Sequence, residues 1–290
     1  MVSSNSWYGP GIRKAFLCRA FLFSIVALLF AGLAAPVQAQ ERYDGSEPRE
    51  KFQIRVGGFR QDNIETTIRV DNTDINLGTI IDLEDILDVE SDLSVFRLDG
   101  FYRFNARHRI DWTWYDSNRN GSAIILEELE IGDEIFPIGA RMETEFRSTV
   151  VKIGYSWSFI NVRKYEFYVG SGLNFRDTSF RFVGQTGTVT QVEDEDILIP
   201  LPTFNFGGRY NFTEKTQISL RWEIFAIEYG DYEGKFQETL ILLEHNTFSH
   251  IGFGGGLTSF LIEMELEDDD WSGEFDTSHN GLMLYMKFYF

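Results

Sequence analysis

A membrane-spanning antiparallel β-barrel is the fold that this sequence predicts, and three observations predict it. Several segments alternate between apolar and polar residues, short polar breaks and long polar stretches separate them, and full-length charges recur on their polar faces. A soluble half-buried strand also alternates, but charges such as Arg221 and Glu223 would be costly in a small soluble core. A polar barrel lumen accommodates such charges. We therefore expect an all-β, up-and-down barrel.

The alternation is clearest at the C-terminal end. One face of this segment carries Leu282, Leu284, Met286, Phe288 and Phe290, while Met283, Tyr285, Lys287 and Tyr289 share the other. The same pattern recurs at 109–115, 151–159 and 217–224. Apolar residues that face lipid and mixed polar residues that face a lumen are typical of a transmembrane barrel strand.

The breaks between the alternating segments predict about ten strands. Short breaks occur at 105–107, 161–163, 212–215 and 246–248, and long polar stretches at 61–92, 118–144, 183–197, 229–235 and 266–279. We expect short periplasmic turns on one rim and long acidic extracellular loops on the other. Eight or twelve strands remain alternatives, because 64–70 could extend the first hairpin and 236–264 is poorly bounded. The expected strands are 52–60, 93–104, 107–117, 145–159, 164–182, 198–211, 216–228, 236–246, 250–264 and 280–290.

The N-terminal segment is typical of a secretory signal peptide. Arg13, Lys14 and Arg19 precede an apolar run from 20 to 35, and Val37-Gln38-Ala39 follows. The run is roughly 15 residues, short of the ~20 that a spanning helix needs. We expect cleavage after Ala39, a short periplasmic segment at 40–50 and one barrel domain at 51–290.

Composition excludes several classes of function. Cleavage after Ala39 removes three of the 26 basic residues and none of the 45 acidic ones, so the net charge becomes −22. Nucleic acid is an unsuitable partner for such a chain, because the phosphates would be repelled. The one cysteine, Cys18, lies in the expected signal peptide, so the mature chain would form no disulfide and no thiolate metal site. The sequence indicates no cofactor.

Two segments resemble known proteins. The terminal Leu-Met-Leu-Tyr-Met-Lys-Phe-Tyr-Phe is similar to the assembly signal of Gram-negative outer-membrane proteins. The segment Val95–Phe104, followed by Arg107-His108-Arg109-Ile110, resembles the second hairpin of uncharacterised small barrels of the OmpA- or OmpW-like kind. The resemblance implies a barrel in the cell outer membrane, assembled by the barrel-insertion machinery through Leu282, Leu284, Met286, Phe288 and Phe290. It transfers no catalytic residue.

Charged residues on the expected inward faces are the main candidate site. Their signs nearly balance, and an unpaired charge in a poorly hydrated lumen is expensive, so we expect ion pairs that fill the barrel. A narrow or gated solute path through the same charges is the alternative. The candidates are Arg97, Asp99, Arg103, Arg109, Asp111, Lys152, Glu166, Arg209, Arg221, Glu223, Glu238, Glu244 and Lys287.

Acidic runs in the expected loops could hold divalent cations. Such ions could bridge the carboxylates to lipopolysaccharide phosphates at the cell surface, although a simply solvated acidic loop gives the same pattern. The first run lacks the central glycine and spacing of an EF-hand loop. The runs are Asp82, Glu84, Asp85, Asp88, Glu90 and Asp92, then 193–196, then 267–270.

No catalytic pair emerges from the sequence. Ser278 and His279 are adjacent, and neighbours on a strand point to opposite faces, so they cannot form the hydrogen bond that activates a nucleophile. Ser249 and His250 are predicted at the opposite rim. We therefore expect a non-enzymatic outer-membrane barrel with a structural or surface-interaction role. A narrow transporter for a small or hydrophobic solute is the first alternative, and a lipid-modifying enzyme a weaker one.

Overall fold

The structure is a computed structural model that describes residues 50–70, 79–131, 134–186, 189–229, 232–268 and 271–290. The chain divides into two compact units, Met1–Asp44 and Gly45–Phe290, and every described residue belongs to the second. The expected signal peptide at 1–39 lies outside the described residues. No helix in the described ranges is long and apolar enough to cross a membrane.

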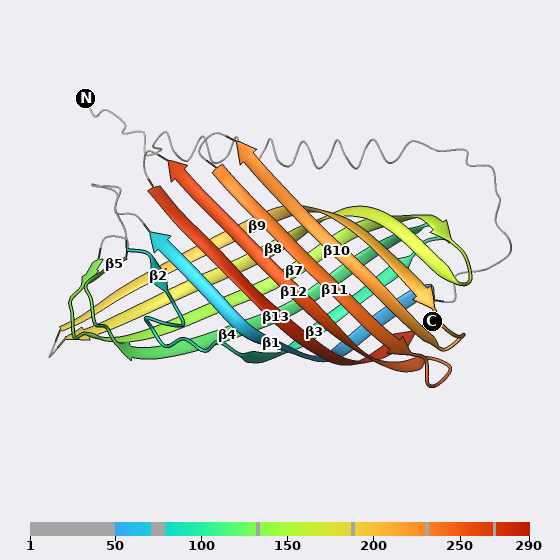
Figure 1. Ribbon diagram of the computed structural model, residues 1–290, viewed down its shortest axis with the longest axis horizontal. Helices are drawn as coiled ribbons and strands as arrows, with labels where there is room; N and C mark the ends of the chain where they lie inside the picture. The colour runs from blue at the N-terminus through green and yellow to red at the C-terminus, as the bar shows by residue number, and fades with distance from the viewer. Residues whose placement is uncertain (1–49, 71–78, 132–133, 187–188, 230–231, 269–270) are drawn as a thin grey trace, which may run out of the picture. The chain divides into compact units, whose positions relative to one another are not determined.

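Ten long strands form a closed antiparallel barrel (Figure 1). Strands adjacent in the sequence pair around the wall, and the last strand pairs with the first over most of its length to close the ring. The predicted all-β barrel is confirmed, and the number of wall strands is ten. They are β1 (Phe52–Val70), β3 (Leu93–Arg103), β4 (His108–Ile124), β7 (Arg141–Asn161), β8 (Tyr165–Thr186), β9 (Val189–Asn211), β10 (Thr216–Tyr229), β11 (Tyr232–His245), β12 (Ile251–Asp268) and β13 (Trp271–Tyr289).

Three shorter strands lie near one end of the barrel. The two-residue β2 (Ile81–Asp82) pairs with β1 at Ile68 and Thr67. The strands β5 (Leu129–Ile131) and β6 (Glu134–Phe136) pair with each other as a small separate sheet. All three belong to the connections β1–β3 and β4–β7, which are the long connections of the described chain.

Short turns define one rim, which we call the turn rim. The N–H of Phe104 donates to the carbonyl of His108, and Asn105 Oδ1 accepts hydrogen bonds from the N–H groups of Arg107 and His108. The turns at 212–215 and 246–250 close in the same way. Both ends of the barrel meet here, because the N–H of Lys51 donates to the carbonyl of Phe290 at 2.6 Å. The predicted short breaks are therefore turns between paired strands.

The outer wall next to the turn rim is an apolar belt. On β13, Leu282, Leu284 and Met286 point outward and are 43, 66 and 37% exposed, and the next outward residue, Asn280, is polar. Exposed apolar residues in contact with water would be costly over so large an area, whereas lipid tails accept them. Other belt residues are Phe96, Tyr102, Ile110, Trp114, Ile153, Trp157, Phe167, Val169, Phe204, Phe206, Leu220, Trp222, Ile224, Ile241, Leu243, Phe253 and Leu257.

Three of the five stretches expected as loops are strands instead. β8 and β9 stay paired up to Thr186 and Val189, and β12 and β13 up to Asp268 and Trp271. The described residues of the stretches 183–197, 229–235 and 266–279 thus continue the wall to the opposite rim, which we call the far rim. Outside the belt a strand turns polar residues to water, so its composition resembles that of a loop.

The two remaining long connections fold back into the barrel. The strand β3 begins only at Leu93, and on its far-rim side the segment 79–91 takes its place in the wall between β1 and β4. The N–H of Leu83 donates to the carbonyl of Thr66 on β1, and the N–H of Glu90 donates to the carbonyl of Asn120 on β4. Gly121 allows the segment 79–91 to lie directly against β4, because a Cβ atom at this position would lie only 2.5 Å from the carbonyl oxygen of Leu87. The connection between β4 and β7 packs Leu129 and Ile131 of β5 and Phe136 of β6 into the far-rim end of the barrel.

An apolar core fills the far-rim half of the barrel, where the sequence had led us to expect polar inward positions. That expectation is wrong, because the inward side chains of the extended strands meet buried apolar residues of the two long connections. We call this cluster the far-rim core. Its members are Ile68, Ile81, Leu83, Leu87, Val89, Ile125, Leu129, Ile131, Phe136, Ala140, Met142, Phe146, Phe180, Phe182, Ile199, Leu201, Phe236, Phe260, Ile262 and Phe275.

The two rims should lie on opposite sides of the membrane. Cysteine at Leu126, which is 89% exposed at the far rim, should react on intact cells with a maleimide that does not cross membranes. Cysteine at exposed Lys215, in a turn, should react only after the cells are opened. The reverse labelling pattern would invert the expected orientation.

Candidate functional site

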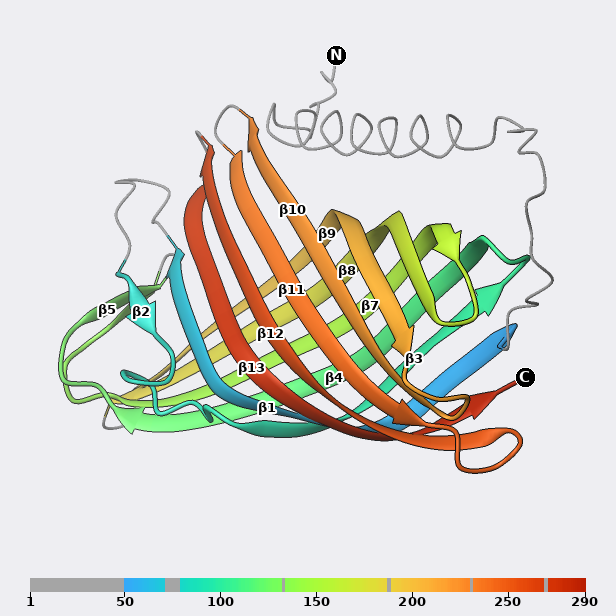
Figure 2. The same cartoon turned by 45° about the vertical axis from the view of Figure 1, so that its right-hand side comes forward.

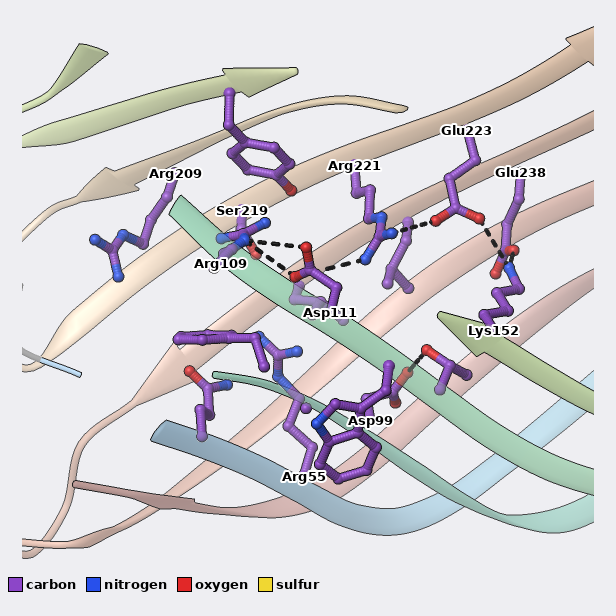
Figure 3. A pocket seen from close by; sticks show the side chains of 18 of the residues that line it. Arg55, Asp99, Arg109, Asp111, Lys152, Arg209, Ser219, Arg221, Glu223 and Glu238 are labelled. Carbon is purple, nitrogen blue, oxygen red and sulfur yellow. Dashed lines mark hydrogen bonds and ion pairs between the residues drawn. The ribbon is translucent and has the colours of Figure 1, made fainter. Parts of the chain in front are cut away.

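Charged side chains from most of the strands meet inside the turn-rim half of the barrel (Figure 3). Their positions follow from the alternation, since every second residue of each strand points inward. All thirteen charges expected in the lumen point inward. Eleven are buried, while the side chains of Arg209 and Arg221 are 16 and 22% exposed.

The first cluster surrounds Glu244 near the turn rim. Its Oε1 accepts a hydrogen bond from Arg55 Nε at 2.7 Å, and its Oε2 lies 3.3 Å from Lys287 Nζ. Tyr285 Oη also donates to Glu244 at 3.1 Å. Lys287 reaches Glu50 at 2.9 Å, which ties the start of the barrel to its last strand. This cluster joins β1, β11 and β13 across the inside of the seam that closes the ring.

The second cluster places one carboxylate among three arginines. Glu166 on β8 lies 2.9 Å from Arg103, 3.2 Å from Arg209 and 4.0 Å from Arg109. Ser158 Oγ donates a further hydrogen bond to Glu166 at 2.5 Å. Glu166 is almost completely buried, so this single carboxylate compensates for positive charge from β3 and β9 and adds to Asp111 in compensating for Arg109 on β4.

The third cluster is a chain of alternating charges that crosses the lumen. Arg221 on β10 lies 3.9 Å from Asp111 on β4 and 2.6 Å from Glu223. Glu223 lies 3.0 Å from Lys152 on β7, and Lys152 also pairs with Glu238 on β11. These strands lie on opposite parts of the ring, so the chain connects the walls (Figure 3). It spans the lumen at this depth.

The same chain continues to β3. Arg97 lies 3.8 Å from Glu238 and 3.0 Å from Asp99, whose carboxylate also accepts a hydrogen bond from Thr113. The guanidinium of Arg97 stacks 5.1 Å from the ring centre of Phe59. Ion pairs, hydroxyl groups and aromatic faces together compensate for the removal of these charges from water.

The lumen cavity left between these clusters is small. Its volume is about 70 Å³, and Arg55, Arg109, Tyr168, Arg209 and Ser219 are among the residues that line it. One water molecule needs at least about 10–15 Å³, so the cavity between the clusters has room for a few waters. No described residue set of three His, Cys, Asp or Glu gathers around a point that could hold a metal ion.

Several inward charges were not predicted. Arg55 shares the face of Gln53, and Arg176 shares the face of Glu166, so the alternation could have revealed both. Arg119 pairs with Glu84 and was missed because 118–144 was expected to be a loop. Glu84 is thus partly committed to an ion pair, although it belongs to an acidic run expected to hold cations.

The arrangement of Ser278 and His279 agrees with the sequence reasoning. His279 points inward and is buried beside Gln61, while Ser278 lies on the outward face. The pair therefore cannot act as nucleophile and base. Ser249 and His250 lie in a turn at the turn rim, at the other end of β13.

Acidic residues gather on the outside of β11, β12 and β13 beyond the belt. Glu233, Glu263, Glu274 and Asp276 line a shallow groove there, and Lys235 lies 3.2 Å from Glu263. Partial burial, together with the nearby carboxylates of Glu274 and Glu263, raises the pKa of Asp276 from 3.8 to about 6. This group lies outside the membrane-spanning belt and titrates in an accessible range.

Removing the Glu166 charge should strongly destabilise the barrel. Glu166→Ala removes the carboxylate that buried Arg103 and Arg109 share with Arg209, and breaking a buried ion pair typically costs about 3–5 kcal/mol. The measurement is urea unfolding in lipid vesicles, followed by tryptophan fluorescence. The control is Glu214→Ala, which breaks an exposed ion pair with Arg163 and should change the midpoint little. Equal midpoints for the two variants would contradict the role of Glu166.

Asp276 should make the barrel less stable as the pH rises. The folded state binds the proton of Asp276 more tightly than the unfolded state, so stability falls as the pH rises from about 4 to about 6. Asp276→Asn, which mimics the protonated form, should be more stable than the unmodified protein at pH 8. The difference should vanish near pH 4 in the same unfolding assay. A difference independent of pH would refute this assignment.

The fold is shared with known outer-membrane proteins, although the sequence is not. No protein-family model and no curated protein matches the chain. The outer membrane protease OmpT from Escherichia coli is similar in structure, with a TM-score of 0.54 and 7% identity over 84% of this chain and 98% of that one.

Two further structures align less well. Ail from Yersinia pestis has a TM-score of 0.35 and 11% identity, and covers 81% of this chain and 97% of its own. OprG from Pseudomonas aeruginosa has a TM-score of 0.31 and 10% identity, and the alignment covers 83% of this chain and 96% of OprG. The likeness to OmpT and the closed antiparallel ring of ten strands give the chain the fold of the outer-membrane β-barrel proteins.

Proposed function

We propose that the protein is an integral outer-membrane barrel with a closed lumen, which acts as a structural or surface-interaction element and not as an enzyme. The observation that carries the proposal is the charge chain from Asp111 through Arg221, Glu223 and Lys152 to Glu238, which joins opposite walls. The far-rim core adds a second, apolar barrier above it. A solute would have to displace both.

The two barriers exclude different kinds of solute. A hydrated ion can exchange with the charges of the network but is unfavourable among buried side chains such as Phe146 and Phe180. An apolar molecule can enter the far-rim core but would then meet buried ion pairs. Because the barriers lie in series, neither class of solute has a continuous favourable path along the barrel.

The segments outside the belt are the surface offered to partners. The far rim carries exposed apolar side chains on the β4–β7 connection, including Leu126 and Ile138, and acidic side chains on β11 to β13. Outer-membrane lipid would contact the belt and lipopolysaccharide the zone just beyond it. Divalent cations remain possible partners of the acidic residues, and the barrel-assembly machinery is the partner proposed for the C-terminal strand.

A narrow transporter for a hydrophobic solute is the second candidate. The apolar interior of the far-rim half favours it, because the belt and the far-rim core could both contact such a molecule. The charge network opposes passage to the turn rim. An apolar solute would therefore need a rearrangement of Arg97, Lys152 and Glu238, or an exit through the wall.

Single-channel recording separates the two functions. The purified protein in a planar bilayer should give no conductance steps at any applied voltage, whereas a purified porin in the same bilayers should conduct. Uptake of an apolar dye into vesicles that contain the protein should equal uptake into empty vesicles. Regular conductance steps would disprove the closed lumen, and dye uptake above the empty vesicles would support the transporter.

A further inference from the structure

The barrel wall is split between β9 and β10 at its far-rim half (Figure 2). The two strands are hydrogen-bonded only from Phe204 to Asn211 on β9 and from Gln217 to Ile224 on β10. Beyond Phe204, β9 pairs with β8 alone, and beyond Ile224, β10 pairs with β11 alone. We call the split between 198–203 and 225–229 the notch.

A second split in the wall is filled, which makes the notch distinctive. Beyond the end of β3, the segment 79–91 bridges β1 and β4 through Leu83, Glu90 and Ser91. At the notch, no backbone group of the described ranges pairs with the free edge of β9 beyond Phe204. A free edge next to the apolar belt is unusual, because lipid cannot satisfy backbone N–H and C=O groups.

Two prolines on β9 explain why the ladder stops. Continuing the register from Phe204 and Ile224 would place Pro202 opposite Ala226 and Pro200 opposite Glu228. Proline has no N–H to donate, and within a sheet it is tolerated where its nitrogen faces away from a partner strand. β9 keeps its ladder with β8 through both prolines, so their nitrogens face the notch. The prolines remove two donors that lipid would leave unsatisfied.

The notch is continuous with the apolar belt. The outward residue Pro200 on β9 begins a row of paired residues that runs across the neighbouring strands. The next members of the row are Phe175 on β8, Val151 on β7 and Trp114 on β4. This row is entirely apolar, whereas the next row, which begins at Leu198, contains Asp177 and Asp116. The notch therefore opens at the edge of the belt.

Apolar side chains also line the inner side of the notch. Ile227 points inward on β10 by the alternation, yet it is 37% exposed. Phe225 on the same face is half-buried against the far-rim core, and Leu201 on β9 is buried within that core. The split thus gives the membrane a short apolar surface that leads from the belt toward the interior.

We propose that the notch binds an acyl chain of a membrane lipid. An acyl chain needs no hydrogen bonds, so it can lie along an edge from which Pro200 and Pro202 have removed the donors. A polypeptide strand is a poorer occupant, because it would find no N–H at either proline. The apolar row that runs from Pro200 on β9 to Trp114 on β4 matches a hydrocarbon chain, and the belt delivers that chain from the surrounding lipid.

Quenching by spin-labelled lipids tests the site. The expected mature chain has no cysteine, so Ile227→Cys can carry a single bimane fluorophore. In vesicles doped with phospholipid that carries a nitroxide on its acyl chain, this position should be quenched as strongly as the belt control Leu220→Cys. Glu233→Cys, exposed beyond the belt, should be quenched much less. Quenching of Ile227→Cys no stronger than that of Glu233→Cys would overturn the proposal.

Restoring the donors tests the role of the prolines. In a Pro200→Val, Pro202→Val background, β9 can pair with β10 beyond Phe204, so quenching at Ile227→Cys should fall to the level of Glu233→Cys. Quenching at Leu220→Cys should not change, and heat-dependent migration on a denaturing gel should verify that the barrel is folded. If the valine variant does not fold, the comparison of the three cysteine positions in the unmodified chain still decides the proposal. Unchanged quenching in the folded valine variant would overturn it.

Discussion

The structure depends on one constraint: backbone N–H and C=O groups that face lipid must find partners within the chain. The pairing of β1 with β13 satisfies this constraint for the two end strands and turns a sheet into a ring. Closure then divides every strand into two faces, because successive side chains point to opposite sides. The apolar belt and the charged lumen are both consequences of this division.

The interior is filled in two physically different ways along its axis. Near the turn rim, the filling is charged, and long side chains such as Arg109 and Lys152 reach carboxylates on other strands, Glu166 and Glu223. Toward the far rim, it is apolar, with Phe146, Phe180 and Phe275 packed against the long connections. A buried charge needs an oppositely charged or hydrogen-bonding partner, which lies on its own strand for Arg97 with Asp99 and on another strand for Lys152 with Glu223, whereas apolar side chains need only contact. The charged half therefore fixes specific partners across the ring.

The exception to backbone closure lies where the sequence removes the donors. β9 contains Pro200 and Pro202 within an otherwise regular strand, and its ladder with β10 ends at Phe204. The far-rim core still covers Leu201 from inside, so the split does not expose the whole interior.

The sequence by itself determined the class of fold and the inward direction of the thirteen predicted charges, because alternation is a local property of each strand. It favoured ten strands but left eight or twelve open. It misjudged 183–197 and 266–279, since a strand outside the membrane has the polar composition of a loop. Only the tertiary structure decided which charges pair, how 79–91 enters the wall, and where the wall splits. Those outcomes depend on contacts between strands distant in sequence, such as Lys152 with Glu238, and on the register that brings Pro202 opposite β10.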